Sequence, residues 1–115
     1  MITQALKQEV SQLEADLCYA LADSTRILIL FALDEKPYNV TDLGLELGIN
    51  QSTTSRHLKI LRDRGVVQTT REGKSIIYHL ADSRLIEALN LLRAVLRDGI
   101  THKAEILKKI HRTEN

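Results

Sequence analysis

The chain has 115 residues, a formal net charge of +1 at pH 7 and a single cysteine. Its length suits one domain with a small core, and one cysteine excludes an intramolecular disulfide framework, as expected in a reducing cytoplasm. No apolar run is long enough to cross a bilayer, and no signal-peptide pattern opens the chain. We therefore expect a single cytoplasmic domain over residues 1–115 with no membrane contact.

Two helices are predicted in the first third of the chain. Between residues 2 and 20, apolar residues recur at three- and four-residue steps among charged ones, which predicts an amphipathic helix. The apolar positions are Ile2, Leu6, Val10, Leu13 and Leu17. Asp23 and Ser24 can cap a second helix over residues 25–33, which is apolar nearly all round and so belongs in the centre of the fold. Arg26 interrupts this helix, and we expect it to pair with an acidic neighbour.

Residues 40–64 predict two short helices joined by a tight turn. The first ends at Gly48, a residue that can adopt the left-handed conformation of a helix cap. Asn50 can cap the second helix, in which successive residues advance about 100° around the axis. The side of this second helix that should be buried carries Thr53, Thr54, His57, Leu58 and Leu61. The opposite side carries Gln51, Ser52, Ser55, Arg56 and Lys59, whose side chains can reach base edges and phosphates.

The pattern then becomes strand-like and predicts a β-hairpin over residues 66–80. Every second residue of 76–80 is apolar, and Gly73 can take the positive φ that the turn needs. Arg71 and Lys74 would flank the tip, where they could contact a phosphate backbone or a minor groove. In isolation, a plain charged turn is the alternative interpretation.

Residues 82–98 predict another amphipathic helix. Its apolar positions are Leu85, Ile86, Leu89, Leu92, Val95 and Leu96. Asp98 and Gly99 could end or bend it, and Thr101 could cap a further helical segment that reaches about residue 111. Because the chain already has a core, apolar stripes on both terminal helices predict an oligomer.

Three motifs are shared with a known family. Residues 50–62, Asn-Gln-Ser-Thr-Thr-Ser-Arg-His-Leu-Lys-Ile-Leu-Arg, match the recognition-helix pattern Ser/Asn-Gln-Ser-x-x-Ser-x-His-Leu-x-x-Leu. Residues 21–30, Leu-Ala-Asp-Ser-Thr-Arg-Ile-Leu-Ile-Leu, are similar to a core-helix signature, and residues 65–80 are similar to a wing. Together these motifs resemble the winged helix-turn-helix repressors of the ArsR/SmtB family, over about residues 17–82.

The resemblance implies a mainly α fold with a small β-hairpin wing, dimeric through helices at about 2–20 and 82–111. It also implies a function, which is to bind double-stranded operator DNA and repress transcription. The charge distribution supports this, since residues 51–74 hold six Lys and Arg against two acidic residues, whereas residues 1–50 hold three basic residues against eight acidic ones. A locally basic face is what phosphate binding requires, although a solvated helix face is the plain alternative. The predicted DNA-binding residues are Gln51, Ser52, Thr54, Ser55, Arg56, Lys59, Arg71 and Lys74.

Motifs of catalysis are missing. The sequence has no Gly-rich phosphate loop, no Cys pair, no His-Glu-x-x-His and no nucleophile motif, so we expect neither an enzyme nor a cofactor. The resemblance assigns metal ligands to four positions of this chain. Asn39 and Thr41 stand where relatives have cysteine, and Arg84 and Val95 stand where relatives have histidine. We therefore expect no metal site. Cys18 lies near the edge of the first apolar stripe, where packing is the plain interpretation and oxidant sensing across a dimer is the alternative.

These observations lead to one main functional hypothesis and two alternatives. The main hypothesis is a dimeric, sequence-specific repressor that is released from DNA by an effector not sensed through the usual metal sites of the family. The first alternative is a constitutive DNA-binding regulator without an effector. The second is a protein-interaction module that has kept the fold and lost DNA binding, and salt-dependent binding to duplex DNA would distinguish it.

Overall fold

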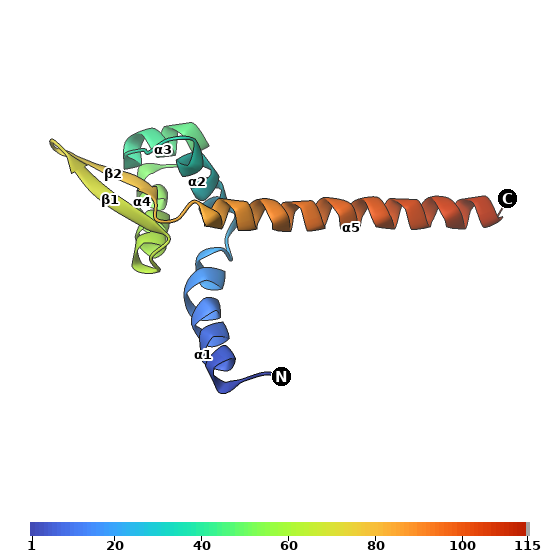
Figure 1. Cartoon of the computed structure of the whole chain (residues 1–115). Coiled ribbons are helices and arrows are strands. Elements are labelled where there is room, and N and C mark those ends of the chain that lie inside the picture. The colour runs from blue at the N-terminus through green and yellow to red at the C-terminus, as the bar shows by residue number, and fades with distance from the viewer. Residues whose placement is uncertain (115) are drawn as a thin grey trace. The chain divides into compact units, whose positions relative to one another are not determined.

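The computed structural model describes residues 1–114 and divides into two units, residues 1–83 and the helix that follows. The elements of the first unit are α1 (Gln4–Leu13), the π-helical turn η1 (Glu14–Cys18), α2 (Ser24–Glu35), α3 (Val40–Leu47), α4 (Gln51–Asp63), β1 (Val67–Glu72) and β2 (Ser75–Leu80). The second unit is α5 (Arg84–Glu114) (Figure 1). The mainly α fold with one antiparallel hairpin confirms the predicted fold class.

The first helix is capped by Thr3, whose Oγ1 accepts a hydrogen bond from the backbone N–H of Leu6 at 3.1 Å. It continues into the π-helical turn η1, which the sequence pattern did not predict. The apolar side chains of Leu6, Val10 and Leu13 are all exposed, so the stripe predicted for this helix has no cover within the first unit.

The second helix begins at the predicted cap, because Asp23 Oδ1 accepts from the backbone N–H of Thr25 at 2.8 Å and of Arg26 at 3.3 Å. It continues past the predicted end at residue 33. The expectation that Arg26 pairs with an acidic side chain is wrong. Its guanidinium is buried and donates to two main-chain oxygens, to Ala20 O from Nε at 2.8 Å and to Tyr19 O from Nη2 at 3.0 Å.

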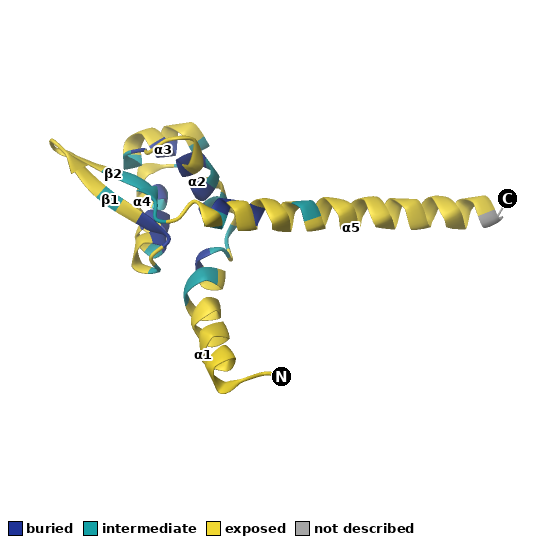
Figure 2. Ribbon diagram, in the orientation of Figure 1, coloured by how far each residue is buried: buried dark blue, intermediate teal, exposed yellow. Residues whose placement is uncertain are grey.

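The core of the first unit lies where α2, α3 and α4 meet the base of the hairpin, whereas α1 is exposed along its length (Figure 2). Each fully buried aliphatic side chain stabilises the fold by about 1.5–3 kcal/mol. These side chains are Ile29, Leu30, Leu43, Leu58, Leu61 and Val67. The prediction that the second helix is central to the fold is confirmed by Ile29 and Leu30.

The hairpin pairs β1 with β2 from Val67 opposite Leu80 to Glu72 opposite Ser75. Its two-residue turn has Gly73 at φ 61° followed by a residue without positive φ, the order found in type II′ turns, so the predicted role of Gly73 is confirmed. The strand β2 also pairs outside the hairpin. Tyr78 exchanges two backbone hydrogen bonds with Tyr38, of 2.8 and 3.1 Å, which attaches the hairpin to the loop before α3.

The helix α5 is a single element of 31 residues, about 46 Å long at 1.5 Å per residue. The alternative in which the helix stops near Gly99 and a new one is capped by Thr101 is wrong, because helix continues through both positions. One glycine costs a helix only about 1 kcal/mol relative to alanine, which is too little to end the helix at this position. No helix in the described part of the chain is long and apolar enough to cross a membrane.

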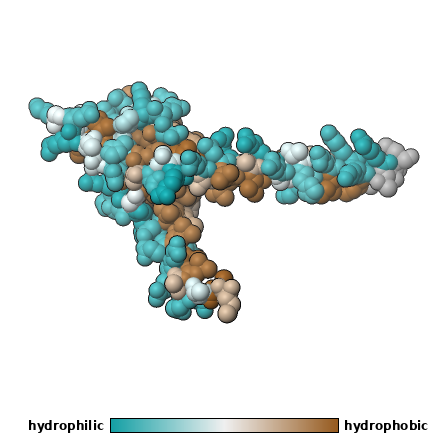
Figure 3. Space-filling model, viewed as in Figure 1, coloured by the Kyte–Doolittle hydropathy of each residue, from teal (hydrophilic) through white to brown (hydrophobic). Residues whose placement is uncertain are grey.

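Apolar side chains remain uncovered on both terminal helices. Figure 3 shows them gathered along α1 and, separately, along α5. On α5 the exposed ones include Leu92, Val95 and Leu96, each more than 60% exposed. Single exposed apolar residues need no explanation, but a contiguous stripe marks a surface that binds a partner.

Candidate nucleic-acid interface

The turn between α3 and α4 fixes where α4 begins. Gly48 adopts φ 68°, and the Ile49 N–H donates to Gly44 O at 3.0 Å, which closes α3 in a Schellman motif. Asn50 then caps α4, its Oδ1 accepting from the Thr53 N–H at 2.8 Å. The caps predicted at Gly48 and Asn50 are both confirmed.

The helices α3 and α4 approach closely at a glycine whose role the sequence pattern did not reveal. A Cβ atom at Gly44 would lie 2.9 Å from Ile49 O and 3.1 Å from Thr54 Oγ1. Alanine at this position would therefore push the turn and α4 away from α3. The only signal in the sequence was a glycine in the interior of a helix, where it normally weakens the helix.

The two sides of α4 differ as predicted. Its buried side holds Thr54, His57, Leu58 and Leu61, and Thr53 is half-buried. Its exposed side holds Gln51, Ser52, Ser55, Arg56 and Lys59. Packing of the apolar side fixes the helix to the core, and an amide, two hydroxyls and two cations are exposed on the other side.

Thr54 is an exception among the predicted DNA-binding residues. It is fully buried, and its hydroxyl donates to Asn50 O at 2.8 Å. This burial argues against a contact between Thr54 and DNA, and we remove the residue from the proposed interface. The hydroxyl instead satisfies a main-chain oxygen of the first turn of α4.

The cations of the exposed side differ in their partners. Lys59 Nζ lies 2.9 Å from Asp63 Oδ2 in an exposed ion pair one helical turn apart. Such a pair contributes only about 0.3–0.5 kcal/mol, so Lys59 can exchange Asp63 for a phosphate at little cost. Arg64 does not belong to this side. It is turned toward the first helix, so the six basic residues of 51–74 do not all lie on one face.

The hairpin supplies the remaining predicted residues. Arg71 near the end of β1 and Lys74 in the turn are both exposed. Figure 1 shows the hairpin projecting from the helical body of the first unit. The two cations are therefore accessible to a molecule that approaches the hairpin tip.

A cluster of buried polar side chains lies on the buried side of α4. Arg26 Nη1 lies 3.4 Å from Nδ1 of His57. Nearby, partial burial raises the pKa of Asp23, but hydrogen bonds from the backbone N–H groups of Arg26 and Thr25, with attraction to the Arg26 guanidinium, outweigh it and hold that pKa below 3.8. His57 was predicted on the buried side, but its arginine partner was not predicted, because residues far apart in sequence give no pairing signal.

Cys18 is exposed in the turn η1. Within the described part of the chain, no group of three or more His, Cys, Asp or Glu residues could hold a metal ion.

Comparison with known proteins gives consistent results. The sequence model described as "Bacterial regulatory protein, arsR family" matches residues 23–69. The HTH-type transcriptional regulator NmtR of Mycobacterium tuberculosis is 39% identical over 88 residues, which are 76% of this chain and 69% of that protein.

Two solved structures are similar to this one. The homodimeric winged helix-turn-helix DNA-binding domain of a Mycobacterium bovis protein, determined by NMR, has a TM-score of 0.75 and 26% identity, covering 88% of this chain and 93% of that one. The crystal structure of the transcriptional repressor BigR from Xylella fastidiosa has a TM-score of 0.68 and 29% identity, covering 82% of this chain and 96% of that one.

Proposed function

This chain belongs to the ArsR family of winged helix-turn-helix transcriptional regulators, which are DNA-binding proteins and not enzymes, and from this premise we propose that it acts as a homodimeric repressor at a specific operator. The two α4 helices of the dimer would enter successive major grooves. The two hairpins would contact the backbone or the minor groove beside them.

The observation that carries this proposal is the division of α4 into a packed side and a free side. An apolar side fixed to the core gives the helix a defined position, and the free side presents Gln51, Ser52, Ser55, Arg56 and Lys59. Small hydroxyls let the helix backbone come close to DNA, while the amide and guanidinium groups match donors and acceptors on base edges.

Dimerisation through α1 and α5 is proposed from the exposed apolar stripes on each helix. Leu6, Val10 and Leu13 are 39–50% exposed on α1, and Leu92 and Leu96 are more than 60% exposed on α5. A second copy of the chain is the partner that we propose, because the similar Mycobacterium bovis domain is described as homodimeric.

We further propose that any effector acts away from the metal sites expected from the family resemblance. Thiolates are missing at Asn39 and Thr41, and imidazoles are missing at Arg84 and Val95. Oxidation at Cys18 is an alternative route, because this thiol is exposed. The alternative function in the same class is a regulator that binds DNA constitutively and needs no effector.

The test begins by selecting duplexes from a randomised DNA pool with the purified protein and titrating them between about 50 and 200 mM salt. Arg56→Ala should weaken binding to the selected sequence by roughly 1–3 kcal/mol and relax base preference, whereas Arg71→Ala should weaken all sequences and reduce the salt slope by about one. Arg97→Ala is the matched control, since it removes an exposed cation from α5 and should change neither property.

Two results would contradict the proposal. Equal affinity of the wild-type protein and Arg56→Ala for the selected duplex would remove α4 as the recognition helix. If the wild-type protein showed no salt-dependent binding to any duplex, the alternative of a protein-interaction module would be preferred.

A further inference from the structure

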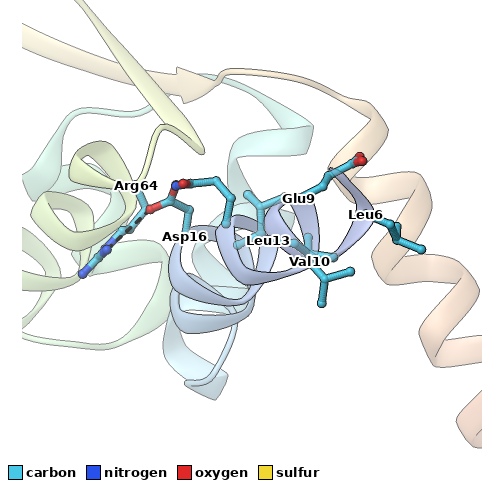
Figure 4. A pocket seen from close by; sticks show the side chains of 8 residues that line it. Leu6, Glu9, Val10, Leu13, Asp16 and Arg64 are labelled. Carbon is cyan, nitrogen blue, oxygen red and sulfur yellow. Dashed lines mark hydrogen bonds and ion pairs between the residues drawn. The ribbon is translucent and has the colours of Figure 1, made fainter. Parts of the chain in front are cut away.

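Arg64 connects the end of α4 to the first helix. Its Nη1 donates to Ala15 O at 3.2 Å and lies 3.5 Å from Asp16 Oδ1. Its guanidinium carbon lies 4.6 Å from the centre of the Tyr19 ring. Figure 4 shows Arg64 facing Asp16, with Leu13 and Val10 farther along the same helix. All three contacts of Arg64 lie within η1 or directly after it.

This connection is made by side chains and not by backbone packing. No Cα atom of α1 or η1 lies within 8 Å of a Cα atom of α4. Arg26 makes a second connection, because it donates to Tyr19 O and Ala20 O and also contacts His57 in the middle of α4. The segment made of η1 and the residues directly after it is thus joined to α4 at two points, each through one arginine.

The chemistry of arginine suits Arg64 to this task. A planar guanidinium can donate to a carbonyl and a carboxylate while one face covers an aromatic ring, and a lysine ammonium cannot make all three contacts at once. Ala15 and Tyr19 are four positions apart and therefore lie on the same face of the helix. Each contact of the partly exposed Arg64 is weak, so their combined effect is to restrict an angle and not to hold the fold together.

We propose that Arg64 is a positioning residue that sets the angle between the first helix and the recognition helix α4, and thereby selects the spacing of the two operator half-sites. The inference rests on the proposed function, in which α1 contributes to the dimer. Recognition helices of a dimer must lie about 34–36 Å apart to enter successive major grooves. A change of angle in each protomer alters this separation twice, once on each side of the two-fold axis.

The first experiment needs no DNA. Spin labels are attached at Gln8→Cys on α1 and Ser52→Cys on α4, in a Cys18→Ser background, and the doubly labelled chain is diluted with unlabelled protein. The distance distribution within one chain is expected to broaden in Arg64→Met and in Tyr19→Leu, which removes the ring from the other side of the contact. Arg62→Met is the matched control, because it removes a neighbouring exposed cation and should leave the distribution unchanged.

The second experiment uses duplexes selected by the wild-type protein, with the half-site spacing then changed by one base pair in either direction. Arg64→Met should reduce the preference for the selected spacing by about fivefold, the lower end of typical couplings between sites. Its salt slope should match that of the wild-type protein. Arg64→Lys keeps the charge but loses the shared contacts, so it should resemble Arg64→Met.

The outcomes separate the inference from the function on which it rests. A distance distribution that is the same in Arg64→Met and in the parent protein overturns the positioning role, whatever the protein does with DNA. A salt slope that falls by about one in Arg64→Met, with equal weakening at all spacings and rescue by Arg64→Lys, would show a phosphate contact and would also overturn it. Failure of the wild-type protein to select any duplex would count against the proposed function alone, because the spin-label distances still test Arg64.

Discussion

Arg26 Nη1 and His57 Nδ1 lie 3.4 Å apart in the core, so a buried guanidinium of α2 faces a histidine of the recognition helix. Because arginine can only donate, Nδ1 is the acceptor, and we assign the ring proton of neutral His57 to Nε2. The same guanidinium binds the carbonyl groups of Tyr19 and Ala20. One side chain therefore holds three segments of the first unit.

Replacing Arg26 with methionine should destabilise the protein by about 2–4 kcal/mol, because two main-chain oxygens and His57 would lose a charged donor in the core. Arg26→Lys keeps the cation but reaches fewer acceptors, so an intermediate loss is expected. Urea unfolding at pH 7 measures both. A loss below about 0.5 kcal/mol in Arg26→Met, typical of surface positions, would show that the cluster contributes little.

Two glycines in helices should respond to alanine in opposite directions. Gly44→Ala should destabilise the protein by about 1 kcal/mol, because a clash with Ile49 O and Thr54 outweighs the gain in helix propensity. At Gly99 no atom lies within 4 Å of the position that the new methyl group would occupy. Gly99→Ala should therefore stabilise α5 by about 0.5–1 kcal/mol, because alanine has the higher helix propensity. Thermal unfolding of both variants at one protein concentration tests this, and a stabilised Gly44→Ala would contradict the close approach of α3 and α4.

The depressed pKa of Asp23 has a consequence for stability in acid. The native pKa lies below the ordinary value of 3.8, so the contribution of this carboxylate is complete above the unfolded pKa and is lost as the pH falls through the native pKa. Asp23→Asn keeps an oxygen that can cap α2 but carries no charge. The difference in unfolding free energy between wild-type protein and Asp23→Asn should therefore be larger at about pH 6 than at about pH 3. A difference that stays constant over this range would mean that only the cap matters.

A charge within the stripe of α5 should disrupt the proposed dimer. Leu92→Glu would place a carboxylate among exposed apolar side chains without disturbing a buried residue, since Leu92 is 61% exposed. Analytical ultracentrifugation at micromolar concentration should show a dimer for the wild-type protein and a shift toward monomer for the variant. Arg97→Glu, at an exposed position about 140° around the helix axis from Leu92, is the control and should remain dimeric. A wild-type monomer at this concentration would end the dimer proposal.

The effector proposal is tested by adding metals and then peroxide to a complex with selected DNA. Zinc, cadmium and arsenite should leave the complex intact, because the thiolate and imidazole ligands are missing from the expected positions. If peroxide releases the DNA, Cys18→Ser should abolish that release. Release by stoichiometric zinc or arsenite would refute the first expectation, and peroxide release that persists in Cys18→Ser would exclude the thiol.

Local signals in the sequence were sufficient to predict the helix-turn-helix. Gly48, Asn50 and Gly73 each act within a few residues through a cap or a turn, and the two sides of α4 follow from helical periodicity. The same periodicity placed Thr54 on the buried side, and its burial argues against including it among the predicted DNA-binding residues.

Contacts between distant residues could not be predicted in this way. Nothing near Arg64 in the sequence indicates that it reaches Ala15, and the acidic neighbour expected for Arg26 was in fact a pair of main-chain oxygens. The π-helical turn η1 also lacks a sequence signal. Gly99 gave a false signal, because the cost of one glycine is too small to stop the helix.

The two hydrogen bonds between Tyr38 and Tyr78 also bear on the order of folding. They close a loop of about forty residues that contains α3 and α4, and closing this loop in an unstructured chain costs about 3 kcal/mol of conformational entropy. Because that cost falls once α3 and α4 have condensed, we expect the hairpin to join a nucleus that these helices have already formed. We therefore expect the attachment of the hairpin to form last during folding and to be lost first during unfolding.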